Sequence, residues 1–158
     1  LPAATGVVCQ ALFAPEWLIE INMVAITEGV KETIFLDRVH PQDITFPPGI
    51  KKGNLFFVSG TTGHHSKTGK LVVGDVAAQT RQTYENIADV LTAGGASLGD
   101  VVKVTDYIDE AALPNYQQAL TVRREFFGHN LPAATTTICN RLLDPMALIQ
   151  VEAIAVID

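Results

Sequence analysis

The sequence predicts an α+β domain in which two helices pack on one face of a mixed β-sheet. Segments of strand-like composition alternate with segments of helical periodicity, and two strand-like segments follow each other near the end of the chain. Of the 158 residues, 47% are hydrophobic, which is enough to fill the core of one domain of this length. In chain order, strand, helix, strand, helix, strand and strand are expected at residues 53–60, 75–93, 101–109, 114–127, 135–142 and 147–156.

The first predicted strand is GNLFFVSG, residues 53–60, an apolar run that glycines close at both ends. The following TTGHHSKTGKLV is rich in Gly, Ser and Thr, and an early hairpin is expected around residues 55–73. His64 and His65 lie in this loop. Adjacent histidines diverge, and no acid or cysteine stands at ligand spacing. The pair therefore predicts a surface loop rather than a metal site, and no metal or other cofactor is expected.

The first predicted helix covers residues 75–93, where the apolar period changes to that of a helix. Asp75 is suited to cap its N-terminus, and Gly94-Gly95 supplies a left-handed stop. The apolar stripe of this helix consists of Ala77, Tyr84, Ile87, Ala88 and Leu91.

The sequence VVKVTDYID, residues 101–109, has the composition and the alternation of a strand. Asp106 falls on its apolar face, which is unusual for a carboxylate. Two interpretations remain open. Asp106 pairs with a basic residue at a subunit contact, which we favour, or it lines a ligand cleft as a second acid. The helix expected at 114–127 has Pro114 near its start and Gly128 at its end.

The first 26 residues resemble the end of the same chain. LPAATGVVCQALFAPEWLIEINMVAI, residues 1–26, aligns without a gap with LPAATTTICNRLLDPMALIQVEAIAV, residues 131–156. We expect residues 1–26 to be the C-terminal hairpin of a preceding duplicated copy, residues 27–31 to be a joint, and residues 32–158 to be one complete domain. The alternative is a chance resemblance between two apolar hairpins.

Composition argues against several classes of protein. The net charge is −6 and no predicted face gathers Lys and Arg, so neither nucleic acid nor an anionic membrane is expected as a partner. The longest apolar runs have the length of a strand, short of a membrane span. Cys9 and Cys139 occupy equivalent places in the two similar segments. They are expected to be small buried side chains rather than a disulfide pair, as suits a reducing cytoplasm.

Five stretches, in this order and spacing, resemble one known family. They are the strand GNLFFVSG, the helix and strand QTRQTYENIADVLTAGGASLGDVVKV, the helix of PNYQQAL and REFF, the strand PAAT and the closing VEAIAV. Together they are similar to the Rid superfamily (YjgF/YER057c/UK114) over residues 32–158 and, through the repeat, over residues 1–26.

The resemblance implies a chorismate-mutase-like fold that assembles as a homotrimer, with small-molecule clefts between neighbouring subunits. It also implies hydrolysis of reactive enamines and imines, such as 2-aminoacrylate, to a keto acid and ammonia. Other members are assigned to 2-aminomuconate deamination, to RNA cleavage or to binding without chemistry. The expected partners are therefore a small molecule, two further copies of the chain and the preceding duplicated copy.

The resemblance places the family's glutamate of the last strand on Glu152. The pattern of the strand, taken without the family, also points to Glu152, because Glu152 is the one acid in an apolar row of side chains on one face of that strand. A carboxyl group among apolar side chains suits general acid–base work on a water. The alternative is a structural carboxylate, held by backbone N–H groups or by an arginine at a subunit interface. The corresponding residue of the N-terminal segment is Asn22.

Three further positions match residues of the family's binding site. Ser59 follows the first strand, where its hydroxyl and nearby amides could hold a carboxylate or a water, or where it only caps the strand end. Asn115 starts the second helix and is expected to bond the local backbone. Thr135 follows the position of the family's arginine in a PAR(S/T) motif.

Two departures from the family bear directly on function. The arginine, which clamps a substrate carboxylate in a bidentate pair, is replaced by Ala134, and by Ala4 in the N-terminal segment. Arg141 is seven residues beyond Ala134 and is expected on the opposite face of the strand. The tyrosine of the family's GPYSQA stretch is replaced by Phe46 in ITFPPGI. A site built around polar partners discriminates strongly, so the ordinary 2-aminoacrylate activity is placed in doubt.

These observations favour a Rid-like enamine or imine deaminase that acts on a non-standard substrate, such as an aminomuconate-type acid held without the usual arginine. The alternative is a non-catalytic trimeric protein that kept the cleft between subunits for ligand binding or as structure. Nuclease activity is disfavoured by the acidic charge and by the lack of a suitably placed histidine.

Overall fold

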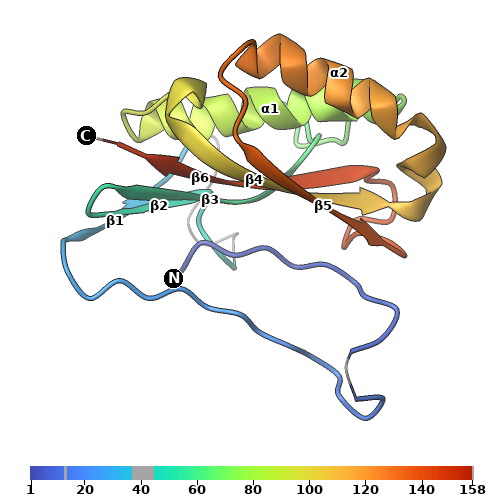
Figure 1. Cartoon of the computed structure of the whole chain (residues 1–158), viewed down its shortest axis with the longest axis horizontal. Coiled ribbons are helices and arrows are strands. Elements are labelled where there is room, and N and C mark those ends of the chain that lie inside the picture. The colour runs from blue at the N-terminus through green and yellow to red at the C-terminus, as the bar shows by residue number, and fades with distance from the viewer. Residues whose placement is uncertain (13, 37–44, 158) are drawn as a thin grey trace.

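The computed structural model describes residues 1–12, 14–36 and 45–157. A six-stranded sheet has the order β1-β2-β3-β6-β4-β5, and its neighbouring strands are antiparallel except for the parallel pair β4–β5. Two helices cover one face of this sheet (Figure 1). The elements are β1 Lys31–Ile34, β2 Gly49–Lys52, β3 Leu55–Thr62, α1 Val76–Ala93, β4 Val101–Asp109, α2 Tyr116–Phe127, β5 Ala133–Cys139 and β6 Ile149–Val156.

The predicted class, a mixed sheet with two helices on one face, is confirmed. The strand predicted at 101–109 is β4 with the same bounds, and the other five predicted elements lie within a few residues of their expected places. β1 and β2 were not predicted, because KETI and GIKK are short, charged sequences without strand periodicity. The hairpin expected at 55–73 is reduced to one isolated bridge between His64 and Leu71, while the real hairpin joins β2 to β3.

Helix α1 begins and ends as the sequence predicts. The Asp75 carboxylate accepts the Ala78 N–H at 2.9 Å, and Gly95 adopts a φ of 77° just beyond the last turn. The buried face is wider than the predicted apolar stripe, because the polar side chains of Gln79 and Thr83 are buried as well. Thr83 donates to its own helix, and Gln79 bonds the backbone before β6. These bonds compensate the burial of the polar groups.

Helix α2 starts two residues later than predicted, because Pro114 belongs to a preceding 3₁₀ helix, Glu110–Asn115. It ends at Gly128, whose φ is 56°. The hydrophobic core lies between the two helices and the sheet, where the Tyr84 ring meets the Phe127 ring edge-on at 5.4 Å between centroids.

Asp106 is completely buried beneath α2, where its carboxylate pairs with Arg123 and accepts the Tyr116 hydroxyl at 2.8 Å. The favoured interpretation, pairing with a basic residue, is right about the chemistry. It is wrong about the place, because Arg123 belongs to the same chain and the pair fixes α2 on the sheet. Asp106 Oδ1 accepts no hydrogen bond from the described residues.

The opposite face of the sheet carries the N-terminal residues (Figure 1). Residues 1–8 run over β3 and the start of β6, and Val8 forms an isolated antiparallel bridge with Arg141. In the described part of residues 1–30 there is no helix or strand, so the predicted hairpin is not formed within this chain. The apolar side chains of residues 17–24 are exposed, with Leu18 at 96%.

Both cysteines are free, as predicted, but only one of them is buried. Cys139 packs in a small apolar cluster with Leu142 and Ala147, and burial raises the pKa of its thiol. Cys9 is exposed, so the expectation of a buried side chain was wrong for that residue. The reason is that Cys9 follows the docked residues 1–8 and has no strand to cover it.

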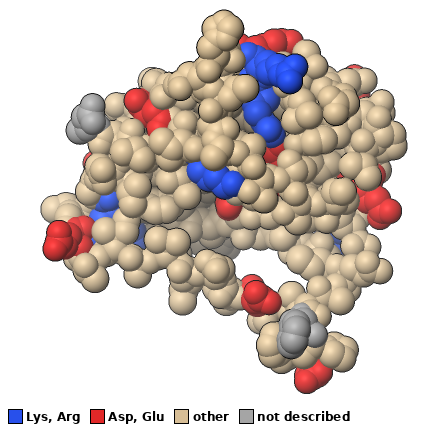
Figure 2. All heavy atoms as spheres, viewed as in Figure 1, with Lys and Arg blue, Asp and Glu red and all other residues tan. Residues whose placement is uncertain are grey.

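The charged side chains form no large patch of one sign on the face shown in Figure 2, where Lys and Arg lie among Asp and Glu. Among the described residues, no helix combines the length and the apolar character needed to cross a membrane.

Candidate functional site

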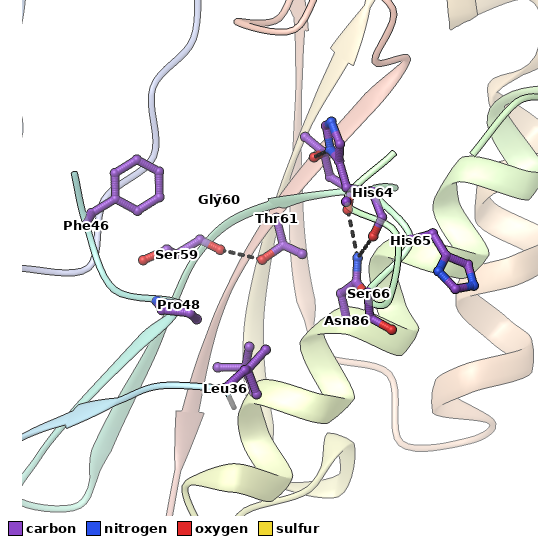
Figure 3. Close-up of a pocket in the computed structure, with 13 residues that line it drawn as sticks. Leu36, Phe46, Pro48, Ser59, Gly60, Thr61, His64, His65, Ser66 and Asn86 are labelled. Atoms are coloured by element: carbon purple, nitrogen blue, oxygen red, sulfur yellow. Dashed lines mark hydrogen bonds between the residues drawn. The ribbon is translucent and has the colours of Figure 1, made fainter. Parts of the chain in front are cut away.

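A cavity of about 330 Å³ lies beside the end of β3 (Figure 3). The end of β3, the loop that follows it, the residues before β2 and helix α1 contribute its walls. It is lined by Leu36, Phe46, Pro48, Ser59, Gly60, Thr61, Thr62, His64, His65, Ser66, Gly69, Asn86 and Val90.

One wall of this cavity is apolar and the other is polar without formal charge. Leu36, Phe46 and Pro48 lie on the apolar side, whereas Thr61 and Asn86 face them from β3 and α1 (Figure 3). Within the described part of the chain, the lining includes no Lys, Arg, Asp or Glu. The cavity therefore offers hydrogen bonds and apolar contact to a ligand, but no charged clamp.

Ser59 is predicted to hold a ligand or a water, and the structure places it in the cavity lining at a β-bulge of β3. Its hydroxyl donates to the Pro47 carbonyl at 2.6 Å and accepts the Ala4 N–H at 3.1 Å, and the residue is only 3% exposed. The single hydroxyl hydrogen is thus already used. Ser59 can meet a ligand as an acceptor, while its donor holds the chain before β2.

His64 and His65 lie in a partly exposed loop after β3, as predicted, and this loop also lines the cavity. His64 Nδ1 is 2.7 Å from the Thr62 hydroxyl, and His64 Nε2 is 3.1 Å from an oxygen of Asp144. A neutral imidazole that donates from Nε2 to Asp144 keeps Nδ1 as an acceptor, which is the orientation of a general base.

The loop that carries His64 is fixed on helix α1. The Asn86 amide donates to the carbonyl oxygens of Thr62 at 3.0 Å and His64 at 2.8 Å. Asp144 is far away in the sequence, so no spacing rule could have connected it with His64. Among the described residues, no three His, Cys, Asp or Glu side chains come together as a metal site.

Glu152 lies outside the cavity lining, on the face of β6 turned away from the helices. β6 pairs with β3 on both sides of the bulge, through Ala153 opposite Val58 and Val151 opposite Thr61. Glu152 therefore lies on the strand next to Ser59, opposite the bulge, and does not line the cavity.

The nearest polar partner of Glu152 is Tyr107 on β4, whose hydroxyl donates to Glu152 Oε1 at 3.3 Å. Burial and then the negative charge of Glu152 raise the pKa of Tyr107 to about 12. The phenol consequently remains protonated near neutral pH and can orient the carboxylate.

The remaining predicted site residues lie at the other edge of the sheet. Ala134 and Thr135 are exposed on β5, which β4 and β6 separate from β3. Asn115 is exposed before α2, and its side chain makes no capping bond, contrary to the expected local bond. The structure thus brings Ser59 and Phe46 together, places Glu152 beside them, and leaves Asn115, Ala134 and Thr135 apart within one chain.

Comparisons with known proteins find relatives over most of the chain. Residues 41–157 match the family model described as Endoribonuclease L-PSP. A RutC family protein of Pyrococcus horikoshii is 38% identical over 126 residues, covering 80% of this chain and 98% of that protein. The 2-iminobutanoate/2-iminopropanoate deaminase of Escherichia coli K12 is 35% identical over 111 residues, covering 68% and 84%. The crystal structure of the E. coli YjgF gene product aligns with a TM-score of 0.71 and 30% identity, covering 79% and 98%.

Proposed function

Because this chain belongs to the Endoribonuclease L-PSP family, also called the Rid or YjgF/UK114 family, we propose that it hydrolyses an imine or enamine to a carbonyl compound and ammonia. The deaminase name of the E. coli relative supports the reaction class. The observation that carries the proposal is the cavity beside Ser59, whose end adjoins the strand of Glu152. The cavity supplies a binding site, and the carboxylate supplies the acid–base group.

The substrate that we propose is larger than 2-iminopropanoate or 2-iminobutanoate, the compounds in the name of the E. coli relative. The family's small imino acids are held by an arginine on their carboxylate, and the described cavity lining has neither Arg nor Lys. Leu36, Phe46 and Val90 instead suit an extended unsaturated chain. The donors of Thr61 and Asn86 are already used within the chain, so these two side chains can meet a ligand only as acceptors. An aminomuconate-type dienoic acid, with its carboxylates toward solvent, fits these features.

The proposed chemistry needs one group that takes and returns a proton. An enamine first takes up a proton on carbon and becomes the imine. Glu152 then removes a proton from water as the oxygen adds to the carbon of the C=N bond, and returns that proton to nitrogen. Transfer of the hydroxyl proton of the carbinolamine to its amino group, again through Glu152, breaks the C–N bond, so that ammonia leaves and a C=O bond forms. Tyr107 holds the carboxylate in position. His64, which lies in the lining and bonds Asp144, is the second candidate for the base.

The test is ammonia release by the full-length protein from a panel of enamine and imine acids generated in situ. We expect Glu152→Gln to lower the rate by about 10²–10⁴-fold, the usual contribution of a general acid–base group. His64→Gln is expected to stay within about tenfold of wild type, and Glu125→Gln, an exposed change on α2, serves as the control.

The outcomes separate the two parts of this proposal. Loss of activity in His64→Gln, with Glu152→Gln unaffected, would move the base to His64 and leave the hydrolase standing. No ammonia from the wild-type protein with any substrate would contradict the hydrolase itself.

A non-catalytic binding protein is the second candidate, and one observation favours it. The Ser59 hydroxyl is committed to Pro47 and Ala4, and the arginine and tyrosine of the family are replaced by Ala134 and Phe46. Such a protein would bind dienoic acids in calorimetry without turning them over. In either case we propose a homotrimer as the assembly that performs the function.

A further inference from the structure

Residues 1–8 are seated on the open face of the sheet by bonds that involve their backbone. The Gly60 N–H donates to the Ala4 carbonyl at 3.0 Å, while the Ala4 N–H donates to Ser59 Oγ at 3.1 Å. The Gln150 amide donates to the Gly6 carbonyl at 3.1 Å. The acceptor surface, as we call it, consists of Ser59, Gly60, Arg141, Leu142, Ala147 and Gln150.

The fit between these residues and the acceptor surface is also steric. A Cβ atom added at Gly60 would lie 2.8 Å from Thr5 Cγ2, closer than two carbons can approach. Val7 packs against the buried cluster that contains Leu142 and Ala147. Glycine at position 60 therefore makes room for Thr5, and the surface is shaped for this particular segment.

The same sequence occurs a second time, on a strand that is free to dock elsewhere. LPAAT at 1–5 is repeated at 131–135, so Thr135 of β5 corresponds to Thr5. Within the part of the chain that the structure describes, β5 is an edge strand with β4 as its only neighbour, and residues 133–138 are exposed. An unpaired edge strand offers its backbone groups to another chain.

We propose that residues 1–8 are an intramolecular competitor for a surface that binds strand β5 of a second copy of this chain. The acceptor surface recognises LPAAT from either source, because the backbone bonds at Ala4 and the space at Gly60 do not depend on which segment supplies the sequence. Docking of β5 in place of residues 1–8 brings Ala134 and Thr135 of the second copy to Ser59. The residues that one chain holds at opposite edges of the sheet then meet between two chains.

The two segments compete on unequal terms. Residues 1–8 are tethered to the sheet, so their effective concentration is on the order of millimolar, whereas β5 of another copy binds at the protein concentration. The tethered segment wins in the wild-type chain unless it is weakened or held elsewhere, so a homotrimer that uses this surface forms only after residues 1–8 have left it. This inference rests on contacts and sequence, and it stands whether or not the proposed chemistry is correct.

The experiment uses the full-length chain and a fluorescent LPAATTTI peptide, the sequence of residues 131–138, with a scrambled peptide beside it. Thr5→Asp places a carboxylate in the partly buried contact with Gly60, where it loses part of its hydration, and should release residues 1–8. We expect the peptide to bind Thr5→Asp at least about tenfold more tightly than wild type, the gain expected from removal of a tethered competitor. Thr135→Asp, the matched change on β5, leaves residues 1–8 docked and should bind as wild type does.

Three further measurements make the test decisive. Gly60→Val combined with Thr5→Asp should abolish peptide binding, because the side chain fills the space that Thr5 occupies. Light scattering at equal protein concentration should show a higher mass for Thr5→Asp than for the double variant Thr5→Asp/Thr135→Asp, because the second change alters the β5 strand that docks. Hydrogen exchange at the Gly60 amide reports whether residues 1–8 have left, and Ala4→Pro, which removes the N–H donated to Ser59, is the substitute if they have not.

The proposal is overturned if the peptide binds no variant in which Gly60 has lost its protection. It is also overturned if binding is equal in wild type and Thr5→Asp, or if Gly60→Val leaves binding unchanged.

Discussion

Asp106 and Arg123 illustrate how one buried pair holds an element in place. The Asp106 side chain has no exposed surface, and its partner Arg123 is the contact through which α2 is fixed on β4. Removing one member of a buried pair leaves the other charge uncompensated.

We therefore expect Asp106→Ala to lower the free energy of unfolding by about 3–5 kcal/mol in urea denaturation. The matched control is Glu125→Ala, which breaks the pair with Arg81 on the helix surface, where both side chains are nearly half exposed. That change should cost less than about 1 kcal/mol. Equal losses for the two variants would show that the buried pair does not anchor α2.

The raised pKa of Tyr107 predicts that the protein loses stability at alkaline pH. Its pKa rises from an ordinary value of 10.0 to about 12, chiefly through burial. The folded state thus holds the phenolic proton where the unfolded state has lost it, so stability is complete below pH 10 and falls as pH rises toward 12. Tyr107→Phe should flatten this fall in unfolding measurements between pH 9 and pH 12, although Tyr84 and Tyr116, whose pKa values are also raised, keep part of it. An unchanged slope would contradict the assignment to Tyr107.

For single residues, the sequence predicts the direction of a side chain more reliably than it predicts the residues that the side chain contacts. Strand alternation was enough to place Asp106 on the buried face, and Glu152 was found both by its apolar neighbours and by the family motif. The partners Arg123, Tyr107 and Asp144 lie on other elements, and only the folded chain brings them into contact.

The C-terminal end of α1 makes the closest approach between a helix and the sheet. A Cβ atom added at Gly94 would overlap the ring of Phe56, which is fully buried on β3. Gly94→Ala should therefore cost about 1–3 kcal/mol by overpacking. Gly99→Ala, where the nearest atom is the exposed Ser97 hydroxyl, should change stability by no more than about 0.5 kcal/mol. If Gly94→Ala and Gly99→Ala change the free energy of unfolding by similar amounts in chemical denaturation, the Phe56 ring moves aside for the added methyl group and the prediction is wrong.

Long periodic elements were predictable and short ones were not. α1 and β4 have enough residues for the helical and the alternating period to be recognised, and Asp75 and the glycines mark the ends of α1. β1 and β2 have four residues each. β1 pairs with β2 and β2 pairs with β3, so both strands depend on the sheet that is already present. Helix α2 is shorter than predicted because Pro114 belongs to the 3₁₀ helix that precedes α2.

At the scale of the whole molecule, the apolar residues before β1 lack a core. Residues 18–25 align with residues 148–155, which include most of the central strand β6, yet in this chain their large apolar side chains are exposed. We propose that residues 1–26 are the last hairpin of a preceding copy, residues 27–31 a joint, and residues 32–158 the complete domain.

The mass of the intact product of the full-length gene tests this duplication. The proposal predicts a product larger than this chain by about one further domain. A product that starts with Met a few residues before Leu1 would contradict it.

The function of the assembled molecule is tested most directly by ammonia release. The full-length protein is incubated with enamine and imine acids formed in situ, including dienoic acids, at concentrations where a Rid deaminase is easily measured. Our account predicts release from an extended substrate and little from the imine of pyruvate, because the described cavity lining has no Arg or Lys for the pyruvate carboxylate. Release of no ammonia from any substrate would contradict the hydrolase and leave the binding protein as the function of this fold.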